Sequence, residues 1–182
     1  MKRKSIILAD PPWLYGDKQG NRKGNYARMR PRDIRALNVH LLAADDAALF
    51  LWSTGPMLPT ALSVMQAWQF EYRTVAFVWS KVSKAGAPRI TIGHYTRPST
   101  EFCLLGVRGR IEVQSHSVRQ LVESVPEPLH SRKPAVVRER IVELLGDLPR
   151  VELFARERVE GWDAWGDEAP AIEGEHAPAL AL

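Results

Sequence analysis

The sequence has few of the residues that build disulfides and metal sites. Only one of its 182 residues is a cysteine, Cys103, so neither an intramolecular disulfide nor a cysteine-rich metal site can form. Cys103 lies in an apolar run and is expected to be a small buried hydrophobic residue. The five histidines are scattered, and no two of them have the spacing of metal ligands. We therefore expect no bound metal.

Long apolar runs are also absent. No segment approaches the roughly 20 apolar residues that a membrane-spanning helix needs. The basic N-terminus is followed only by the apolar residues 6–9 before Asp10, and this run is too short for the core of a signal peptide. The sequence therefore predicts a cytoplasmic protein with no membrane partner.

Three common enzyme fingerprints are missing as well. The sequence contains no GxGxxG and no P-loop motif of the form GxxxxGKS or GxxxxGKT. It also contains no serine in a Gly-x-Ser-x-Gly context. Standard dinucleotide-binding proteins, P-loop enzymes and α/β-hydrolases are therefore not supported.

Positive charge is concentrated towards the N-terminus. The formal net charge is +4, but residues 166–182 contain four acids and no Lys or Arg, which leaves +8 on residues 1–165. Residues 1–35 alone contain ten Lys or Arg and three Asp. This distribution indicates a polyanionic partner, although a solvated basic face is the common alternative.

Apolar runs of strand length alternate with segments of helical periodicity. The pattern predicts strands at 5–9, 47–52, 72–79, 102–107 and 151–154, and helices at 31–37, 58–68 and 134–145. This alternation predicts an α/β fold with a mostly parallel sheet and helices on both faces. Ligands of such sheets bind beyond the carboxyl ends of the strands.

The length fits one domain, which we place at residues 1–168. Residues 14–30 and 80–100 are basic, contain glycine and have no periodicity, so we expect exposed loops there. After Glu168 the sequence turns to Ala, Pro, Glu and Gly, which predicts a disordered tail over 169–182.

The segment after the first predicted strand has the most informative chemistry. It is Asp10-Pro11-Pro12-Trp13, and because neither proline has an N–H, it offers a carboxylate and carbonyls as fixed acceptors. Trp13 adds a flat face for stacking a base. Hydrogen-bond acceptors beside an aromatic ring suit a substrate with N–H donor groups, such as the exocyclic amine of adenine or cytosine. Alternatively, the segment merely ends a strand and Trp13 belongs to the core.

With blocks further along the chain, this segment resembles the MT-A70-type adenine N6-methyltransferases, in their bacterial and phage branch. The blocks are DPPW at 10–13, NYARM at 25–29, LFLW at 49–52, GHY at 93–95, EFCLLGVRG at 101–109, HSRKP at 130–134, ELFAR at 152–156 and GWDAWG at 161–166. A single block would be weak, but all of them in this order are specific.

The resemblance implies a Rossmann-like methyltransferase fold with a circularly permuted motif order and S-adenosyl-L-methionine as methyl donor. Asp10 and Pro11 would orient the target amine, Pro12 would shape the pocket and Trp13 would line it. The implied cofactor contacts are Ala9, Asp10, Ser131, Lys133, Phe154, Arg156, Arg158, Asp167 and Glu168. The implied substrate contacts are Tyr15, Arg22, Lys23, Tyr26 and His94.

Some of these roles have ordinary alternatives. Without the family block, Lys133 before a helix and Arg156 after a strand would be solvated cations. The family commonly has Asn at the position of Asp167, and a carboxylate accepts hydrogen bonds from ribose hydroxyls but cannot donate one. His94 could equally make a structural hydrogen bond.

The leading hypothesis is an active adenine N6-methyltransferase that acts on DNA rather than RNA, because the compact chain lacks the extensions of the eukaryotic RNA enzyme. An RNA adenosine N6-methyltransferase is one alternative. Another is a catalytically silent nucleic-acid-binding subunit, which the intact DPPW disfavours. Methylation of a small molecule or protein is disfavoured by the basic loops. Nucleic acid is the expected partner, and a homodimer or a partner subunit stays open.

Overall fold

The computed structural model describes residues 3–15, 28–126 and 132–166. Its strands are β1 (Lys4–Ala9), β2 (Ala43–Ser53), β3 (Glu71–Lys81), β4 (Thr100–Arg108), β5 (Leu121–Ser124), β6 (Arg150–Leu153) and β7 (Asp163–Trp165). Its helices are α1 (Pro31–Ala36), α2 (Val39–Leu42), the short 3-10 helix η1 (Gly55–Met57), α3 (Leu58–Ala67) and α4 (Val136–Leu145). None of these helices has both the length and the apolar character of a membrane span.

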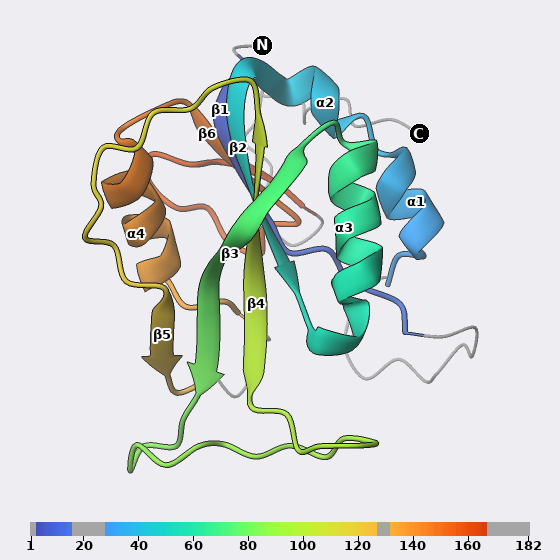
Figure 1. Cartoon of the computed structure of the whole chain (residues 1–182), viewed down its shortest axis with the longest axis vertical. Helices are drawn as coiled ribbons and strands as arrows, with labels where there is room; N and C mark the ends of the chain where they lie inside the picture. The colour runs from blue at the N-terminus through green and yellow to red at the C-terminus, as the bar shows by residue number, and fades with distance from the viewer. Residues whose placement is uncertain (1–2, 16–27, 127–131, 167–182) are drawn as a thin grey trace.

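The strands form one seven-stranded sheet in the order β5-β3-β4-β2-β1-β6-β7 (Figure 1). Four of its neighbouring pairs are parallel, and β4 alone runs antiparallel to both its neighbours, β2 and β3. The chain returns from β3 to β4 through residues 82–99 without a helix, which fits their antiparallel pairing, because a parallel crossover usually contains a helix. The expected mostly parallel α/β fold is confirmed, and it is consistent with a Rossmann-like methyltransferase.

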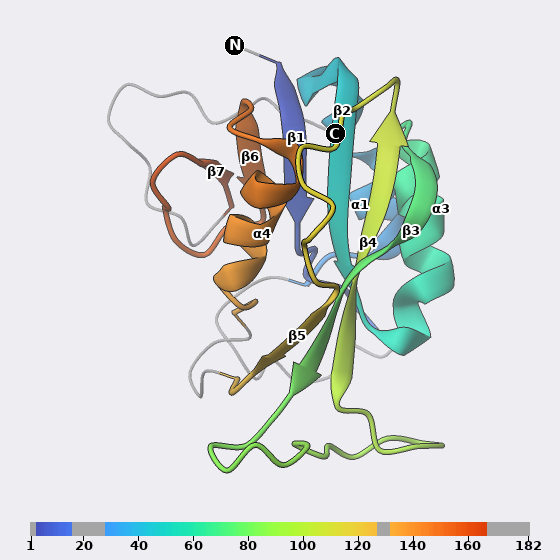
Figure 2. The same ribbon diagram turned by 60° about the vertical axis from the view of Figure 1, so that its left-hand side comes forward.

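Helices cover both faces of the sheet. Figures 1 and 2 show α1 and α3 on one face and α4 on the other. Successive residues of β1 alternate between the two cores, with Ile7 in the cluster that α3 covers and Ile6 in the cluster that α4 covers. Both side chains are fully buried, as is Cys103, which confirms its expected place in the core.

The sequence pattern missed the short and polar parts of these elements. It gave no strand at β5 or β7, which have four and three residues, too few for periodicity to show. It also began β2 at residue 47, whereas the strand starts at Ala43 and runs through the exposed Asp45 and Asp46. The helix expected at 31–37 is α1 followed by a separate α2, because Leu37 has an extended backbone conformation (φ −63°, ψ 133°).

The carboxyl ends of several strands lie at the lower end of the sheet in Figure 1. Since β1, β2, β3 and β6 run in one direction, their carboxyl ends lie together at this end, and the antiparallel β4 begins there. The residues at these ends include Asp10 after β1, Lys81 in β3 and Glu101 in β4. The fold therefore places the DPPW segment beside residues that lie about 70 to 90 positions away.

Candidate active site

An ionic network lies at this end of the sheet. Lys133 donates a hydrogen bond to Asp10, with 2.7 Å between Nζ and Oδ2, and its Nζ lies 3.3 Å from Oε2 of Glu101. Lys81 donates to the other oxygen, Oε1, of Glu101. The side chains of Lys133, Asp10 and Glu101 are 12%, 20% and 11% exposed. Lys133 is therefore a largely buried partner of two carboxylates and not the solvated lysine of the alternative interpretation.

The network keeps Glu101 and Lys133 charged. Burial alone would raise the pKa of Glu101, but the positive charges and hydrogen bonds of Lys133 and Lys81 outweigh it and hold this pKa below its ordinary value. Burial alone would lower the pKa of Lys133, but Asp10 and Glu101 outweigh it and raise this pKa. At neutral pH, Glu101 is therefore an anion and Lys133 a cation.

Aromatic side chains form the wall beside the network. Trp13 is only 7% exposed, and its Nε1 donates to the carbonyl oxygen of Trp52 over 3.2 Å. The ammonium of Lys133 lies 5.5 Å from the centre of the Trp52 ring. Tyr15 is 46% exposed, and its hydroxyl lies 2.8 Å from Oγ1 of Thr54. The exposed ring is thus that of Tyr15, whereas Trp13 belongs to the core and reaches the pocket with a small part of its surface.

The tyrosine hydroxyl stays protonated near neutral pH. Burial, the largest effect, raises the pKa of Tyr15, and the hydrogen bond with Thr54 lowers it only in part. Tyr15 is thus available as a neutral hydrogen-bonding group beside the pocket.

A pocket of about 160 Å³ opens between the network and this wall. It is lined by Asp10, Pro11, Pro12, Trp13, Tyr15, Arg28, Ser53, Thr54, Glu101, Lys133 and Arg156. The pocket therefore combines anions, cations and aromatic surface, which suits a planar base that has donor groups.

The backbone carbonyls of the DPPW segment are less free than the sequence suggested. The carbonyl of Pro11 accepts from the N–H of Trp13 over 2.8 Å, and the carbonyl of Pro12 accepts from the N–H of Met29 over 2.9 Å. Each carbonyl keeps a second lone pair. Of the two carboxylates in the pocket, Glu101 has a lysine on each oxygen, whereas Lys133 holds Asp10 through only one. The strongest acceptor left in the pocket is therefore the carboxylate of Asp10.

A smaller pocket of about 20 Å³ adjoins the first and shares Asp10, Lys133 and Arg156 with it. Its other lining residues are Arg132, Arg138, Glu152, Phe154 and Glu157. Arg138 of α4 holds the carboxylate of Glu152 with two hydrogen bonds, of 2.7 Å from Nε and 3.2 Å from Nη2. Burial raises the pKa of Glu152 despite this pairing.

The backbone after β6 has a constrained shape. Phe154 has a φ of 62°, a left-handed conformation that non-glycine residues adopt rarely. Its ring meets that of Trp165 edge to face, with 5.3 Å between the centres. Close by, a Cβ on Gly166 would overlap the backbone of Ala155, so only glycine allows this approach. A backbone outlier beside a pocket is typical of functional sites.

The structure brings together eight of the eleven predicted site residues that it describes. Asp10, Pro11, Pro12, Trp13, Tyr15, Lys133 and Arg156 line the larger pocket, and Phe154 lines the smaller one. Six further predicted residues, Arg22, Lys23, Tyr26, Ser131, Asp167 and Glu168, lie outside the described residues.

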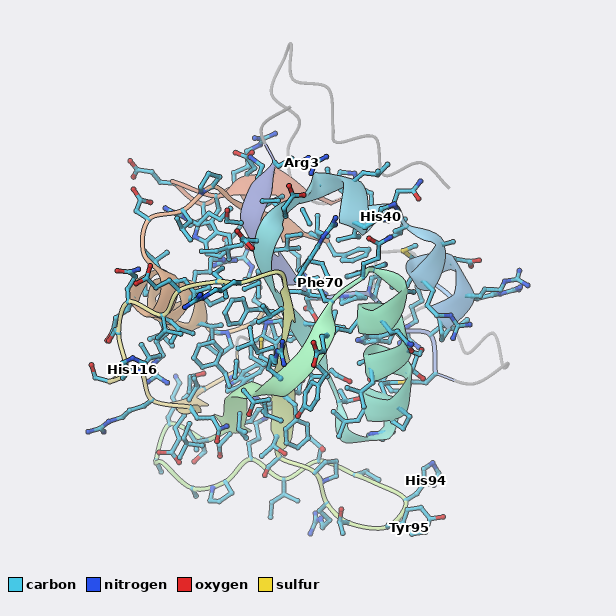
Figure 3. All side chains as sticks on the ribbon, turned by 45° about the horizontal axis from the view of Figure 1, so that its top comes forward. Arg3, His40, Phe70, His94, Tyr95 and His116 are labelled. Carbon is cyan, nitrogen blue, oxygen red and sulfur yellow. The ribbon has the colours of Figure 1, made fainter. Side chains whose placement is uncertain are left out.

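Three predicted residues lie apart from the two pockets. Ala9 is fully buried in β1, so its side chain has no access to a ligand. Arg158 is exposed and lines neither pocket. His94 lies on the exposed loop 82–99, well away from the sheet (Figure 3).

Several residues of the site had no role in the sequence analysis, and four of them make its ion pairs, namely Lys81, Glu101, Arg138 and Glu152. The others line the pockets: Arg28, Ser53, Thr54, Arg132 and Glu157. Glu101 and Glu152 each begin a conspicuous block, EFCLLGVRG and ELFAR, and a carboxylate at the border of an apolar strand was the signal available. Lys81 and Arg138 gave no such signal, because their pairing depends on which strands and helices become neighbours.

Comparison with known proteins gives a consistent result. The sequence model of the MT-A70 family matches residues 4–168. The type II methyltransferase M.MunI of Mycoplasma sp. is 35% identical to this chain, and the alignment covers 93% of this chain and 79% of M.MunI.

Two eukaryotic relatives match over a smaller share of their own length. An N(6)-adenosine-methyltransferase MT-A70-like protein of Arabidopsis thaliana is 29% identical to this chain. The alignment covers 92% of this chain and 24% of the Arabidopsis protein. The N(6)-adenine-specific methyltransferase METTL4 of Homo sapiens is 26% identical over 92% of this chain and 38% of its own. The chain thus spans most of the Mycoplasma relative but less than two fifths of these two.

Proposed function

Because this chain belongs to the MT-A70 family of adenine N6-methyltransferases, we propose that it transfers the methyl group of S-adenosyl-L-methionine to adenine in DNA. The main support is the carboxylate of Asp10, which Lys133 fixes at the junction of the two pockets. A methyl donor in one pocket and a base in the other would meet at this side chain.

The chemistry of adenine explains the need for a fixed acceptor. Its exocyclic amine is a weak nucleophile, because its lone pair is delocalised into the ring. A hydrogen bond from this amine to Asp10 localises the lone pair and aims it. Lys133 holds Oδ2 of Asp10, so Oδ1 can accept from the amine while the carboxylate keeps its orientation. Holding the reacting groups in line then supplies much of the rate acceleration.

The side chains around the smaller pocket match the chemical groups of the proposed methyl donor, and the pocket, at about 20 Å³, has to widen to receive it. S-adenosyl-L-methionine supplies an electrophilic methyl group on a sulfonium, together with an amino-acid end, ribose hydroxyls and a base. The carboxylates of Asp10 and Glu152 suit its ammonium and hydroxyl groups, and Lys133 and Arg156 suit its carboxylate. Phe154 offers a ring face for its base.

The larger pocket is proposed to receive the target adenine. The exposed ring of Tyr15 and the rigid prolines Pro11 and Pro12 provide surfaces for a planar base, and Asp10 provides the acceptor. Arg28 lines the same pocket, and its proposed role is to contact a phosphate beside the target nucleotide. No metal or covalent enzyme intermediate is needed for a direct displacement of this kind.

DNA is proposed over RNA because the chain is more similar to a type II methyltransferase, at 35% identity, than to the N(6)-adenosine-methyltransferase MT-A70-like protein of Arabidopsis thaliana, at 29% identity. Residues 1–35 and the loop 82–99 provide cations for a phosphate backbone, which supports nucleic acid as the substrate.

The proposal is tested by mass spectrometry of nucleosides. DNA and RNA are incubated separately with the protein and a donor that has a deuterated methyl group, and both are then digested. We expect labelled N6-methyladenine from DNA. Label in RNA alone would make the protein an RNA methyltransferase, and donor binding without label in either would make it a silent subunit.

A first prediction concerns the salt dependence of DNA binding. Replacing Arg22 and Lys23 by alanine should weaken binding and reduce the slope of log K against log salt by about 2, since each phosphate contact contributes about 0.9. The slope is measured by fluorescence anisotropy between low and moderate salt. Binding of the methyl donor, measured by calorimetry, serves as the control and should not change. An unaltered slope would remove both residues from the DNA-binding surface.

A further inference from the structure

Residues 82–99, which we call the arm, extend from the end of the sheet that holds the larger pocket (Figure 1). The ends of the arm are joined to the ionic network. Lys81 precedes the arm and pairs with Glu101, which follows it closely and pairs in turn with Lys133. The base of the arm is therefore fixed beside the residues that line the pocket.

The arm has an internal structure that presents its outer end. The N–H of Arg89 donates to the carbonyl of Lys81 over 2.7 Å, which closes the inner part of the arm. Further out, the hydroxyl of Thr91 donates to the carbonyl of Pro98 over 2.6 Å and closes a second loop. Within this loop, which we call the tip (residues 92–97), a Cβ on Gly93 would overlap the carbonyl oxygen of Thr96. The tip is thus a tight turn that requires glycine.

Two large side chains of the tip are completely exposed. Ile92 is 96% exposed and Tyr95 is 102% exposed. Figure 3 shows Tyr95 and its neighbour His94 pointing outward from the tip, away from the body of the protein. Scattered apolar side chains are ordinary on a protein surface, but two at the end of a closed turn, on an arm whose base adjoins a pocket, indicate a contact surface.

The charge of the arm indicates what this surface contacts. The arm contains Lys84, Arg89 and Arg97 and no Asp or Glu. An apolar tip flanked by cations complements a stack of bases flanked by phosphates. A second copy of the same arm would instead bring like charges together. The arm therefore suits nucleic acid better than a partner copy.

We propose that the tip is a wedge that enters the DNA base stack beside the target adenine, with Ile92 and Tyr95 between bases and Arg89 and Arg97 on phosphates. This inference rests on the proposed function. The amine of an adenine in duplex DNA is hidden in the stack, so the nucleotide has to leave the stack before it reacts. Apolar side chains that insert between base steps unstack them. The wedge would thus deliver the base to a pocket that lies at the foot of the arm.

The test compares wild type with the double variant Ile92→Ala, Tyr95→Ala on three substrates of the same sequence. These are a duplex, a duplex in which the target adenine is mispaired, and the single strand. We expect duplex methylation to fall on the order of tenfold or more, because unstacking is then unassisted. Methylation of the mispaired duplex should fall less, and that of the single strand least, because their target base costs less energy to unpair and unstack.

Base extrusion is measured directly with 2-aminopurine in place of the target adenine. Its fluorescence should rise when wild type binds the duplex and should rise much less with the double variant. Tyr72→Ala is the matched control. Tyr72 is 43% exposed and lies near the amino end of β3, whereas the arm follows the carboxyl end of this strand. Both variants alter exposed side chains, and unchanged melting temperatures would confirm that they fold.

Three outcomes would overturn the wedge. The first is an equal loss on duplex and single strand, and the second is a wild type that methylates single strands alone. The third is a change of oligomeric state in the double variant, measured by sedimentation, which would make the tip an interface between copies. A wild type that methylates no nucleic acid would instead reject the proposed function itself.

Discussion

Replacing Asp10 by alanine should abolish methyl transfer, and replacing it by asparagine should reduce the rate by about a hundredfold or more. Lys133 binds Oδ2 of Asp10, which leaves one oxygen for the amine. In Asp10→Asn, the amide oxygen would turn to the ammonium of Lys133, and the amide NH₂ group would then face the target amine as a competing donor. Asparagine is therefore the sharper substitution, since it preserves size and removes the acceptor.

The assay requires a saturating concentration of methyl donor, because Asp10 also lines the smaller pocket and its loss should weaken donor binding. The melting temperature of Asp10→Asn should stay close to that of wild type, since Lys133 keeps its ion pair with Glu101. If Asp10→Ala turned over at a rate near that of wild type, the DPPW segment would only end a strand.

Replacing Lys133 by methionine should lower the free energy of unfolding at pH 7 by about 3 kcal/mol, near the lower end for breaking a buried ion pair. The lysine side chain is 12% exposed, and its loss leaves Asp10 and Glu101 without their shared cation. Binding of the methyl donor should weaken as well, because Lys133 lines both pockets.

The pH dependence of this loss has a definite sign. In wild type the pKa of Glu101 is lowered, so its pairing stabilises the fold above the ordinary carboxyl pKa, and this stabilisation disappears as the pH falls through the lowered value. In Lys133→Met the pKa of Glu101 should rise. The difference between the two proteins should therefore be largest near neutral pH and should shrink below about pH 4.

Urea unfolding at pH 7 and in acid measures this difference. Arg73→Met is the control, because Arg73 pairs with Glu71 on the surface, where both side chains are at least half exposed. That variant should lose less than about 1 kcal/mol. A Lys133→Met protein that was as stable as wild type at pH 7 would contradict the ionic network.

The core strands of the fold could be predicted from the sequence because they consist of apolar runs. The runs that became β1 and β4 are buried on two faces, and their composition alone indicated strands. β5 has four residues at the edge of the sheet, and Leu121 within it is half exposed, so it gave no clear pattern. A periodic apolar pattern arises where one side of a strand or helix is buried. Elements at the edge of a sheet are less buried, so their sequences show a weaker pattern.

The site could be predicted only in part, because some of its contacts depend on which strands become neighbours. Asp10 and Lys133 stand in blocks that resemble a known family, so each could be found without the other. Their contact with Glu101 and Lys81 depends on β4 lying between β2 and β3, and no local pattern contains that order. The same limit explains why the bound carbonyls of Pro11 and Pro12 looked free in the sequence.

The central claim is that Asp10 holds the amine that is methylated, and a crystal structure of the ternary complex tests it most directly. The complex would contain the protein, a DNA duplex with the unmodified target adenine and a non-reactive analogue of S-adenosyl-L-methionine. We expect the adenine outside the base stack, with its amine about 3 Å from the Asp10 carboxylate, and the analogue beside Glu152 and Phe154. An adenine bound elsewhere, with no contact to Asp10, would contradict this account.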